Sequence, residues 1–166
     1  MLTDAVRLLV FPALMAFAAS SDLFTMTISN RVTLALVGGF VAMAVISGMS
    51  PSDVLAHAGA AATVLVVTFL FFTRGWIGGG DAKLAAATAL WFGFDHLLVY
   101  LLYASIFGGA LTLMMIRFRL MSLPQVLADQ EWVNRLHRPN SGVPYGIALA
   151  AAALLIYPDT TWMQLR

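Results

Sequence analysis

The chain has 166 residues, of which 61% are hydrophobic and only 10% are charged, and its formal net charge is +1. A soluble domain carries about 25% charged residues. The apolar surplus therefore excludes an ordinary soluble domain and indicates an integral membrane protein. The small net charge does not indicate a nucleic-acid partner, and the absence of cysteine excludes disulfides, thiol-ligated metals and a cysteine nucleophile.

Six apolar segments follow one another along the chain, and each is predicted to be a membrane-spanning helix. A transmembrane helix needs about 20 mostly apolar residues, and these continuous runs lack the alternation of outer-membrane strands. The predicted segments are 2–20, 31–48, 54–73, 83–94, 97–116 and 143–157. Only Asp95-His96 separates the fourth from the fifth, which predicts a tight hairpin. We expect one all-α domain over residues 1–166, a polytopic bundle of about six transmembrane helices.

Basic residues set the predicted orientation, because lysine and arginine concentrate in cytoplasmic loops. Seven of the nine fall in the first, third and fifth loops: Arg31, Arg74, Lys83, Arg117, Arg119, Arg135 and Arg138. These loops are therefore predicted to be cytoplasmic and both termini to lie outside. Within the fifth loop, 117–142, a short amphipathic helix starting near Ser122 and a solvated linker remain alternative interpretations. His57 is interpreted as an interfacial polar residue.

Two of the eight acidic residues occupy unusual places. Asp4, Asp53, Asp95, Asp129, Glu131 and Asp159 fall in loops or at helix ends. Asp22, by contrast, ends the first segment and Asp81 begins the fourth, at the same predicted cytoplasmic boundary. Ionisable residues at such a depth are costly and usually face a protein interior or a water-filled cavity. The two aspartates could therefore share one site, although each could instead be a helix cap.

A pair of close carboxyls has a specific chemistry. Both cannot ionise cheaply, so one keeps a proton and can donate it to a carbonyl oxygen, while the other takes a proton from water. This chemistry needs neither a metal nor another cofactor. The glycines before Asp81 can let another backbone approach closely, so that an extended peptide could lie beside the carboxylate.

Three motifs together resemble a known family. Gly78-Gly79-Gly80-Asp81-Ala82-Lys83-Leu84 is similar to the GxGDxKL motif of type IV prepilin peptidases, which are polytopic aspartic proteases, although presenilin-like proteases share GxGD. The segment from Asp22 to Asn30 resembles the family's first aspartate and its Ile-Pro-Asn signature, with Ser29 in place of the proline. Val143-Pro144-Tyr145-Gly146 is similar to the family's entry into the last helix.

The resemblance implies roles for individual residues. Asp22 and Asp81 would be the catalytic pair. Residues that would shape the site or bind substrate are Gly78, Gly79, Gly80, Lys83, Asn30, Pro144 and Gly146. Because residues two apart on a helix do not face each other, we do not expect Lys83 to pair with Asp81. Lys83 could instead anchor at lipid headgroups or meet an acidic group of the substrate, and Asn30 could cap the second helix or hold the first loop.

The resemblance also implies a substrate and a place. The chain is similar to the short, peptidase-only branch found with tight-adherence (Flp) pili, which lacks the cysteine-containing domain that methylates the new N-terminus. The implied activity is removal of a basic leader from a prepilin or pseudopilin, at the cytoplasmic side of the bacterial inner membrane, without N-methylation. Implied partners are the prepilin, membrane lipids and the pilus assembly machinery. Alternatives are a non-catalytic assembly protein and a small proton- or cation-coupled transporter.

Overall fold

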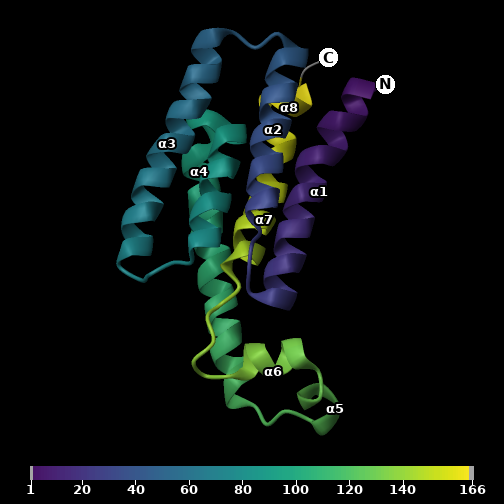
Figure 1. Ribbon diagram of the computed structural model, residues 1–166, viewed down its shortest axis with the longest axis vertical. Coiled ribbons are helices and arrows are strands. Elements are labelled where there is room, and N and C mark those ends of the chain that lie inside the picture. The colour runs from purple at the N-terminus through teal and green to yellow at the C-terminus, as the bar shows by residue number, and fades with distance from the viewer. Residues whose placement is uncertain (1, 165–166) are drawn as a thin grey trace.

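The protein folds from helices (Figure 1). The computed structural model describes residues 2–164 and, of these, the side chains of residues 8–163. No β-strand occurs among the residues that it describes, which confirms the predicted all-α class. The helices are α1 (Leu2–Thr25), α2 (Asn30–Ser47), α3 (Pro51–Thr73), α4 (Gly79–Leu120), α5 (Gln125–Ala128), α6 (Glu131–His137), α7 (Tyr145–Ile156) and, after a 3-10 turn at Tyr157–Asp159, α8 (Thr161–Gln164).

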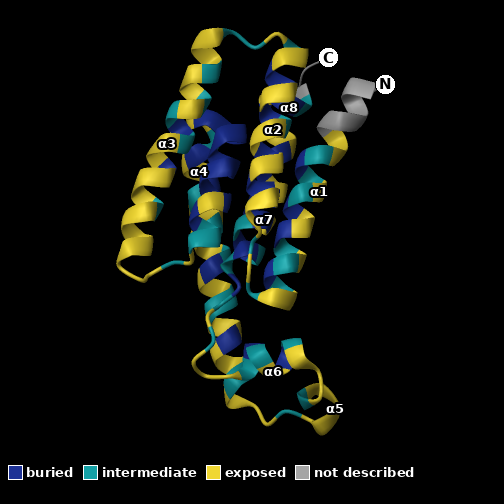
Figure 2. Cartoon of the chain, in the orientation of Figure 1, coloured by how far each residue is buried: buried dark blue, intermediate teal, exposed yellow. Residues whose placement is uncertain are grey.

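The outer surface of the bundle suits lipid rather than water. The helices α1, α2, α3 and α4 are long and apolar enough to cross a membrane, and α7 is apolar but shorter. Large apolar side chains point outward; Leu98 is 78% exposed and Val45 is 75% exposed. Figure 2 shows exposed residues along the outer sides of α2 and α3. Such a surface would aggregate in water, whereas a bilayer covers it. The prediction of a membrane helix bundle is confirmed.

Helix α4 is folded back on itself at Gly93. Gly93 has φ +61° and ψ −171°, which are not helical values. A straight helix of 42 residues would be about 63 Å long, yet Asp81 and Thr112 line the same cavity. We call residues 79–92 the first arm and residues 94–120 the second arm. The predicted hairpin between the fourth and fifth segments is therefore present, with its turn at Gly93 rather than at Asp95-His96.

Side chains from two other helices cap the end of the first arm. The turn at Gly93 frees carbonyl groups that a continuous helix would bond internally. His57 Nδ1 donates to the Leu90 carbonyl at 2.8 Å, and Trp162 Nε1 donates to the Trp91 carbonyl at 2.6 Å. A Cβ at residue 93 would lie 3.0 Å from His57 Nε2, so the contact also requires glycine. His57, which the sequence suggested to be an interfacial polar residue, is partly buried and has this additional role in the fold.

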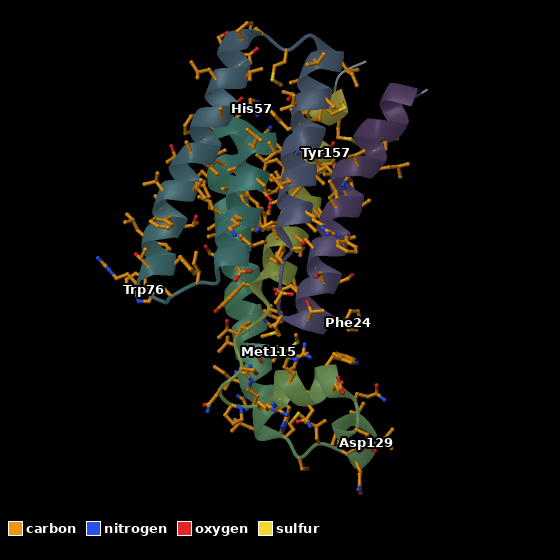
Figure 3. The ribbon with its side chains drawn as sticks, in the orientation of Figure 1. Phe24, His57, Trp76, Met115, Asp129 and Tyr157 are labelled. Atoms are coloured by element: carbon orange, nitrogen blue, oxygen red, sulfur yellow. The ribbon has the colours of Figure 1, made fainter. Side chains whose placement is uncertain are left out.

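The connections between helices alternate between the two ends of the bundle. The α1–α2 and α3–α4 connections and the α5–α6 segment lie toward one end, whereas the α2–α3 connection, α8 and the start of α1 lie at the other (Figure 1). Figure 3 accordingly places His57 and Tyr157 toward one end and Phe24 and Met115 toward the other. This is the alternation that six consecutive spanning segments predict. Which end faces the cytoplasm remains a prediction from the charges.

The fifth loop forms two short helices, α5 and α6, that are attached to the bundle. Arg135 Nη1 donates to the Phe24 carbonyl at 2.9 Å, and the Trp132 ring meets the Phe24 ring edge-on at a centroid distance of 5.3 Å. Arg119, near the end of the second arm, donates to the carbonyls of Leu136, Ser141 and Gly142 at 2.7–2.9 Å. These contacts hold the segment against the end of the second arm and against Phe24 of α1, two residues beyond Asp22.

Candidate active site

Asp22 lies in the last turns of α1 and is buried, with 5% of its surface exposed. The first helix continues to Thr25, so Asp22 is inside the helix rather than at its end as predicted. Its Oδ2 atom accepts a hydrogen bond of 2.7 Å from the backbone N–H of Gly146. A buried carboxylate needs such a donor, because burial without a partner is costly.

The start of α7 supplies this donor. Pro144 is the buried N-cap of the helix, and Gly146 is its second residue. The first N–H groups of a helix have no partner within the helix and carry the positive end of its dipole, so they favour a carboxylate. A Cβ at residue 146 would lie 2.8 Å from both Asp22 Oδ2 and Ile28 Cδ1. Only glycine at position 146 therefore allows α7 to come this close to Asp22. The segment that begins at Asp22 and the segment Val143-Pro144-Tyr145-Gly146, two of the three motifs that resemble the family, are thus in contact.

Asp81 is the third residue of α4, and its carboxylate accepts a hydrogen bond from the backbone N–H of Gly78, the N-cap. This is one half of a capping box, in which the third helical residue reaches back to the N-cap. Asp81 therefore caps the start of α4, as one of the two interpretations of the sequence predicted. Capping does not exclude a catalytic role, since the partly buried side chain also lines a large cavity.

The two aspartates belong to the same site. Ile28 is the shared neighbour: its Cβ would be 3.2 Å from a Cβ at Gly80, and its Cδ1 would be 2.8 Å from one at Gly146. The α1–α2 connection that carries Ile28 therefore fits between the starts of α4 and α7. Asp22, which contacts Gly146, and Gly80, which precedes Asp81, are thus linked through Ile28 although α1 and α4 are distant in sequence.

The three glycines before Asp81 pack against the protein itself. A Cβ at Gly78 would lie 2.9 Å from Asp81 Oδ2, and one at Gly79 would lie 3.3 Å from the Phe72 ring. Gly80 faces Ile28 at 3.2 Å. At Gly80 the neighbour includes the backbone of Ile28, whose N and O atoms would lie 3.4 and 3.6 Å from a Cβ, so another backbone does approach closely there. The glycines shape the site by letting α4 begin close to these neighbours.

Asn30 and Lys83 form a direct link between α2 and α4. Lys83 Nζ donates to Asn30 Oδ1 at 2.9 Å. Asn30 is the first residue of α2, and Ser29, which replaces the family's proline, is the N-cap that accepts a bond from the Arg31 N–H at 3.2 Å. As expected, Lys83 does not pair with Asp81. The link fixes the start of the first arm relative to the α1–α2 connection.

A cavity of about 600 Å³ opens beside Asp81. It lies between α3, both arms of α4 and the start of α7. Its walls include Thr68 and Phe71 of α3, Ala104, Ser105, Gly108, Gly109, Thr112 and Leu113 of the second arm, and Tyr145 of α7. These residues were not predicted from the sequence to line a cavity. A pattern that could have indicated them is the recurrence of small residues every four positions in the second arm, which is typical of close packing in membranes.

The site can perform acid–base chemistry with its two carboxyls. One can accept a proton from water while the other donates to a carbonyl oxygen. The first arm is about 21 Å long, which is shorter than the roughly 30 Å of hydrocarbon in a bilayer. No group of three or more His, Asp and Glu among the described residues is placed to hold a metal ion.

These features define a class of protein: a polytopic helical membrane protein with two aspartates from separate helices at one site. Residues 9–113 match the model of the type IV leader peptidase family. The match covers more than half of the chain and includes Asp22 and Asp81, and the chain belongs to this family of peptidases, which implies a prepilin substrate. The resemblance seen in the sequence is confirmed at the level of the family. No curated protein and no solved structure matches the chain.

Proposed function

We propose that the protein is an aspartic endopeptidase in which Asp22 and Asp81 form the catalytic pair. The observation that carries the proposal is their convergence: a buried carboxylate of α1, held by the Gly146 amide, and a carboxylate of α4 that lines a cavity. Paired carboxyls that share a proton can hydrolyse a peptide bond without other groups.

The proposed reaction moves protons between water, substrate and the two carboxyls. The ionised carboxylate takes a proton from water, and the water oxygen attacks the peptide carbonyl carbon. The protonated carboxyl gives its proton to the carbonyl oxygen. When the tetrahedral intermediate collapses, the C–N bond breaks, the amine takes the proton that the first carboxyl had received, and the second carboxyl regains its proton from the hydroxyl of the intermediate.

We further propose that the substrate is a prepilin or pseudopilin of the Flp type, cleaved at the cytoplasmic face of the bacterial inner membrane. The basic residues support this face. The seven predicted cytoplasmic basic residues lie at helix ends next to the α1–α2 and α3–α4 connections or in the segment from the end of α4 to α6, and these parts of the chain lie toward one end of the bundle (Figure 1). Cleavage without N-methylation is part of the same proposal and follows from the resemblance to the peptidase-only branch.

The test is co-expression with the prepilin encoded nearest to this protein, with leader removal followed on a gel. Asp22→Asn and Asp81→Asn should each lower processing by at least about 100-fold at normal membrane levels. Asp95→Asn is the matched control, since Asp95 is exposed next to the Gly93 turn and outside the site. Full processing by either site variant would refute the catalytic pair. Mass spectrometry of the mature N-terminus should find it unmethylated.

A further inference from the structure

The cavity beside Asp81 is unusually uniform in its chemistry. Asp81 is the only charged residue among the described residues that line it. Its volume of about 600 Å³ is in the range of ligand pockets, about 300–1,000 Å³, and is enough for more than one side chain. An occupant that reaches Asp81 must therefore place several groups against the remaining walls.

Those walls are apolar in effect, although four of the lining residues carry hydroxyls. Ser105 Oγ donates to the Leu101 carbonyl at 2.7 Å, and Thr68 Oγ1 donates to the Val64 carbonyl at 2.7 Å. Thr112 Oγ1 donates to the Gly108 carbonyl at 2.8 Å and is 2.9 Å from the Tyr145 hydroxyl. These hydroxyls are engaged with the protein itself. Away from Asp81 these walls therefore offer no charged partner to a lysine or arginine of a basic leader, which would lose its hydration there.

One wall is formed by small residues of the second arm. Ala104 and Gly108 are four apart, as are Ser105 and Gly109, so each pair lies on one face of the helix. Small residues at this spacing let another chain approach closely in a membrane. A Cβ at Gly109 would have no heavy atom within 4 Å, whereas one at Gly108 would touch the Tyr145 ring at 3.4 Å. A side chain introduced at residue 109 would thus point into free space.

The cavity is continuous with the lipid-facing surface. Leu113 on the second arm is 66% exposed, and Phe71 on α3 is 41% exposed; both line it. A substrate anchored in the bilayer can therefore reach Asp81 sideways, between α3 and the second arm, without leaving the membrane. The apolar walls and the lateral opening both fit an apolar segment of a substrate that is anchored in the bilayer.

We infer that this cavity binds the apolar residues of the prepilin next to the scissile bond, those that begin its membrane-spanning segment, and that Gly109 limits the size of their side chains. The inference rests on the proposed function, because the substrate is placed by the need to bring its peptide bond to Asp81. The basic leader then leaves the site on the other side of the scissile bond, away from the second arm.

The test compares Gly109→Leu with Gly38→Leu. Gly38 is also a helical glycine whose Cβ would meet no atom within 4 Å, but it lies on the exposed side of α2, outside the cavity. Both changes add the same side chain. With the purified protein in liposomes and the prepilin as substrate, Gly109→Leu should lower kcat/KM by about 10- to 200-fold, chiefly through KM. Gly38→Leu should leave it unchanged.

Substrate variants make the test specific. Replacing the bulky apolar residues that follow the scissile bond by alanine, one at a time, should restore cleavage by Gly109→Leu for at least one position, which a general folding defect would not allow. A photo-crosslinking residue at position 113, in the Asp22→Asn background, should attach to the apolar segment of the prepilin.

The outcomes separate the inference from the proposed function. If the unaltered protein cleaves and Gly109→Leu matches Gly38→Leu in kcat/KM, the inference is overturned and the peptidase stands. Crosslinks to the basic leader would also overturn it. If Gly109→Leu is absent from the membrane, the inference is tested instead by the kcat/KM of Gly109→Ala and by the crosslink from position 113. A kcat/KM equal to that of the unaltered protein, together with no crosslink to the apolar segment, overturns the inference. If the unaltered protein cleaves no prepilin while it is present and folded, the proposed function fails first.

Discussion

Gly146→Ala is the sharpest test of how the site is held. The added methyl group would lie 2.8 Å from Asp22 Oδ2 and from Ile28 Cδ1, whereas ordinary contacts begin at 3.4 Å. Asp22 and α7 must then separate by about 0.6 Å, the difference between the two distances. The hydrogen bond from the Gly146 amide, now 2.7 Å, lengthens with it. The substitution therefore acts on the position of the Asp22 carboxyl, which we propose to be catalytic, without removing it.

The expected effects follow from this displacement. A misplacement of 1 Å can cost about 100-fold in rate, so a shift of about 0.6 Å should lower kcat by roughly 10-fold or more. Overpacking costs about 1–3 kcal/mol, partly offset by about 1 kcal/mol because alanine favours a helix over glycine. The protein should thus remain folded while kcat falls and KM changes little.

The assay is leader removal from the prepilin by purified protein, with melting temperature measured in parallel. Gly38→Ala is the control, because it makes the same chemical change on a helix where no atom lies within 4 Å. Wild-type kcat in Gly146→Ala would refute the reasoning, since it would mean that the close contact does not position Asp22. A large fall in melting temperature with unchanged activity per folded molecule would also refute the reasoning.

Three further predictions concern the surroundings of the site. Lys83→Met removes the bond to Asn30, an exposed contact, and should lower kcat/KM by no more than about fivefold; a loss as large as that of Asp81→Asn would instead give Lys83 a catalytic role. Trp162→Phe leaves a buried carbonyl of the first arm without its donor. It should lower the free energy of unfolding by about 1–3 kcal/mol, seen as a lower melting temperature, and an unchanged melting temperature would contradict this cap. The chain has no cysteine, so Ser52→Cys and Met121→Cys can be labelled singly: an impermeant thiol reagent should label Ser52→Cys from outside the cell and Met121→Cys only from inside, and the reverse pattern would invert the predicted orientation.

The sequence was informative where one physical constraint dominated. Carboxylates are too costly to place in an apolar run without a purpose, so Asp22 and Asp81 could be singled out from eight acids. The hairpin in α4 was predicted as well, because two apolar segments so close together cannot both span the membrane unless the chain reverses. Its turn was misplaced at the charged residues Asp95-His96, since the sequence does not show that His57 and Trp162 cap the first arm at Gly93.

The parts that could not be predicted depend on contacts between distant segments. The amide of Gly146 meets Asp22 across 124 positions of sequence, and no local pattern contains that contact. The glycine triplet was interpreted as room for a substrate backbone, and the sequence could not show that a Cβ at these positions would meet Asp81, Phe72 or Ile28 of the protein itself. The cavity is likewise made by four helical segments and has no signature in any one of them.

A final prediction concerns Asp81, because its capping role and its proposed catalytic role can be separated by two substitutions. In Asp81→Asn the side-chain oxygen can still accept the Gly78 N–H, so the start of α4 stays capped while acid–base chemistry is lost. Asp81→Ala loses both, and should be less stable than Asp81→Asn by about 1 kcal/mol. Both variants should be inactive in leader removal. Equal stability of the two variants would show that the Gly78 contact contributes nothing to folding. Activity of Asp81→Asn comparable with that of the unaltered protein would show that the Asp81 carboxylate is a helix cap and has no catalytic role.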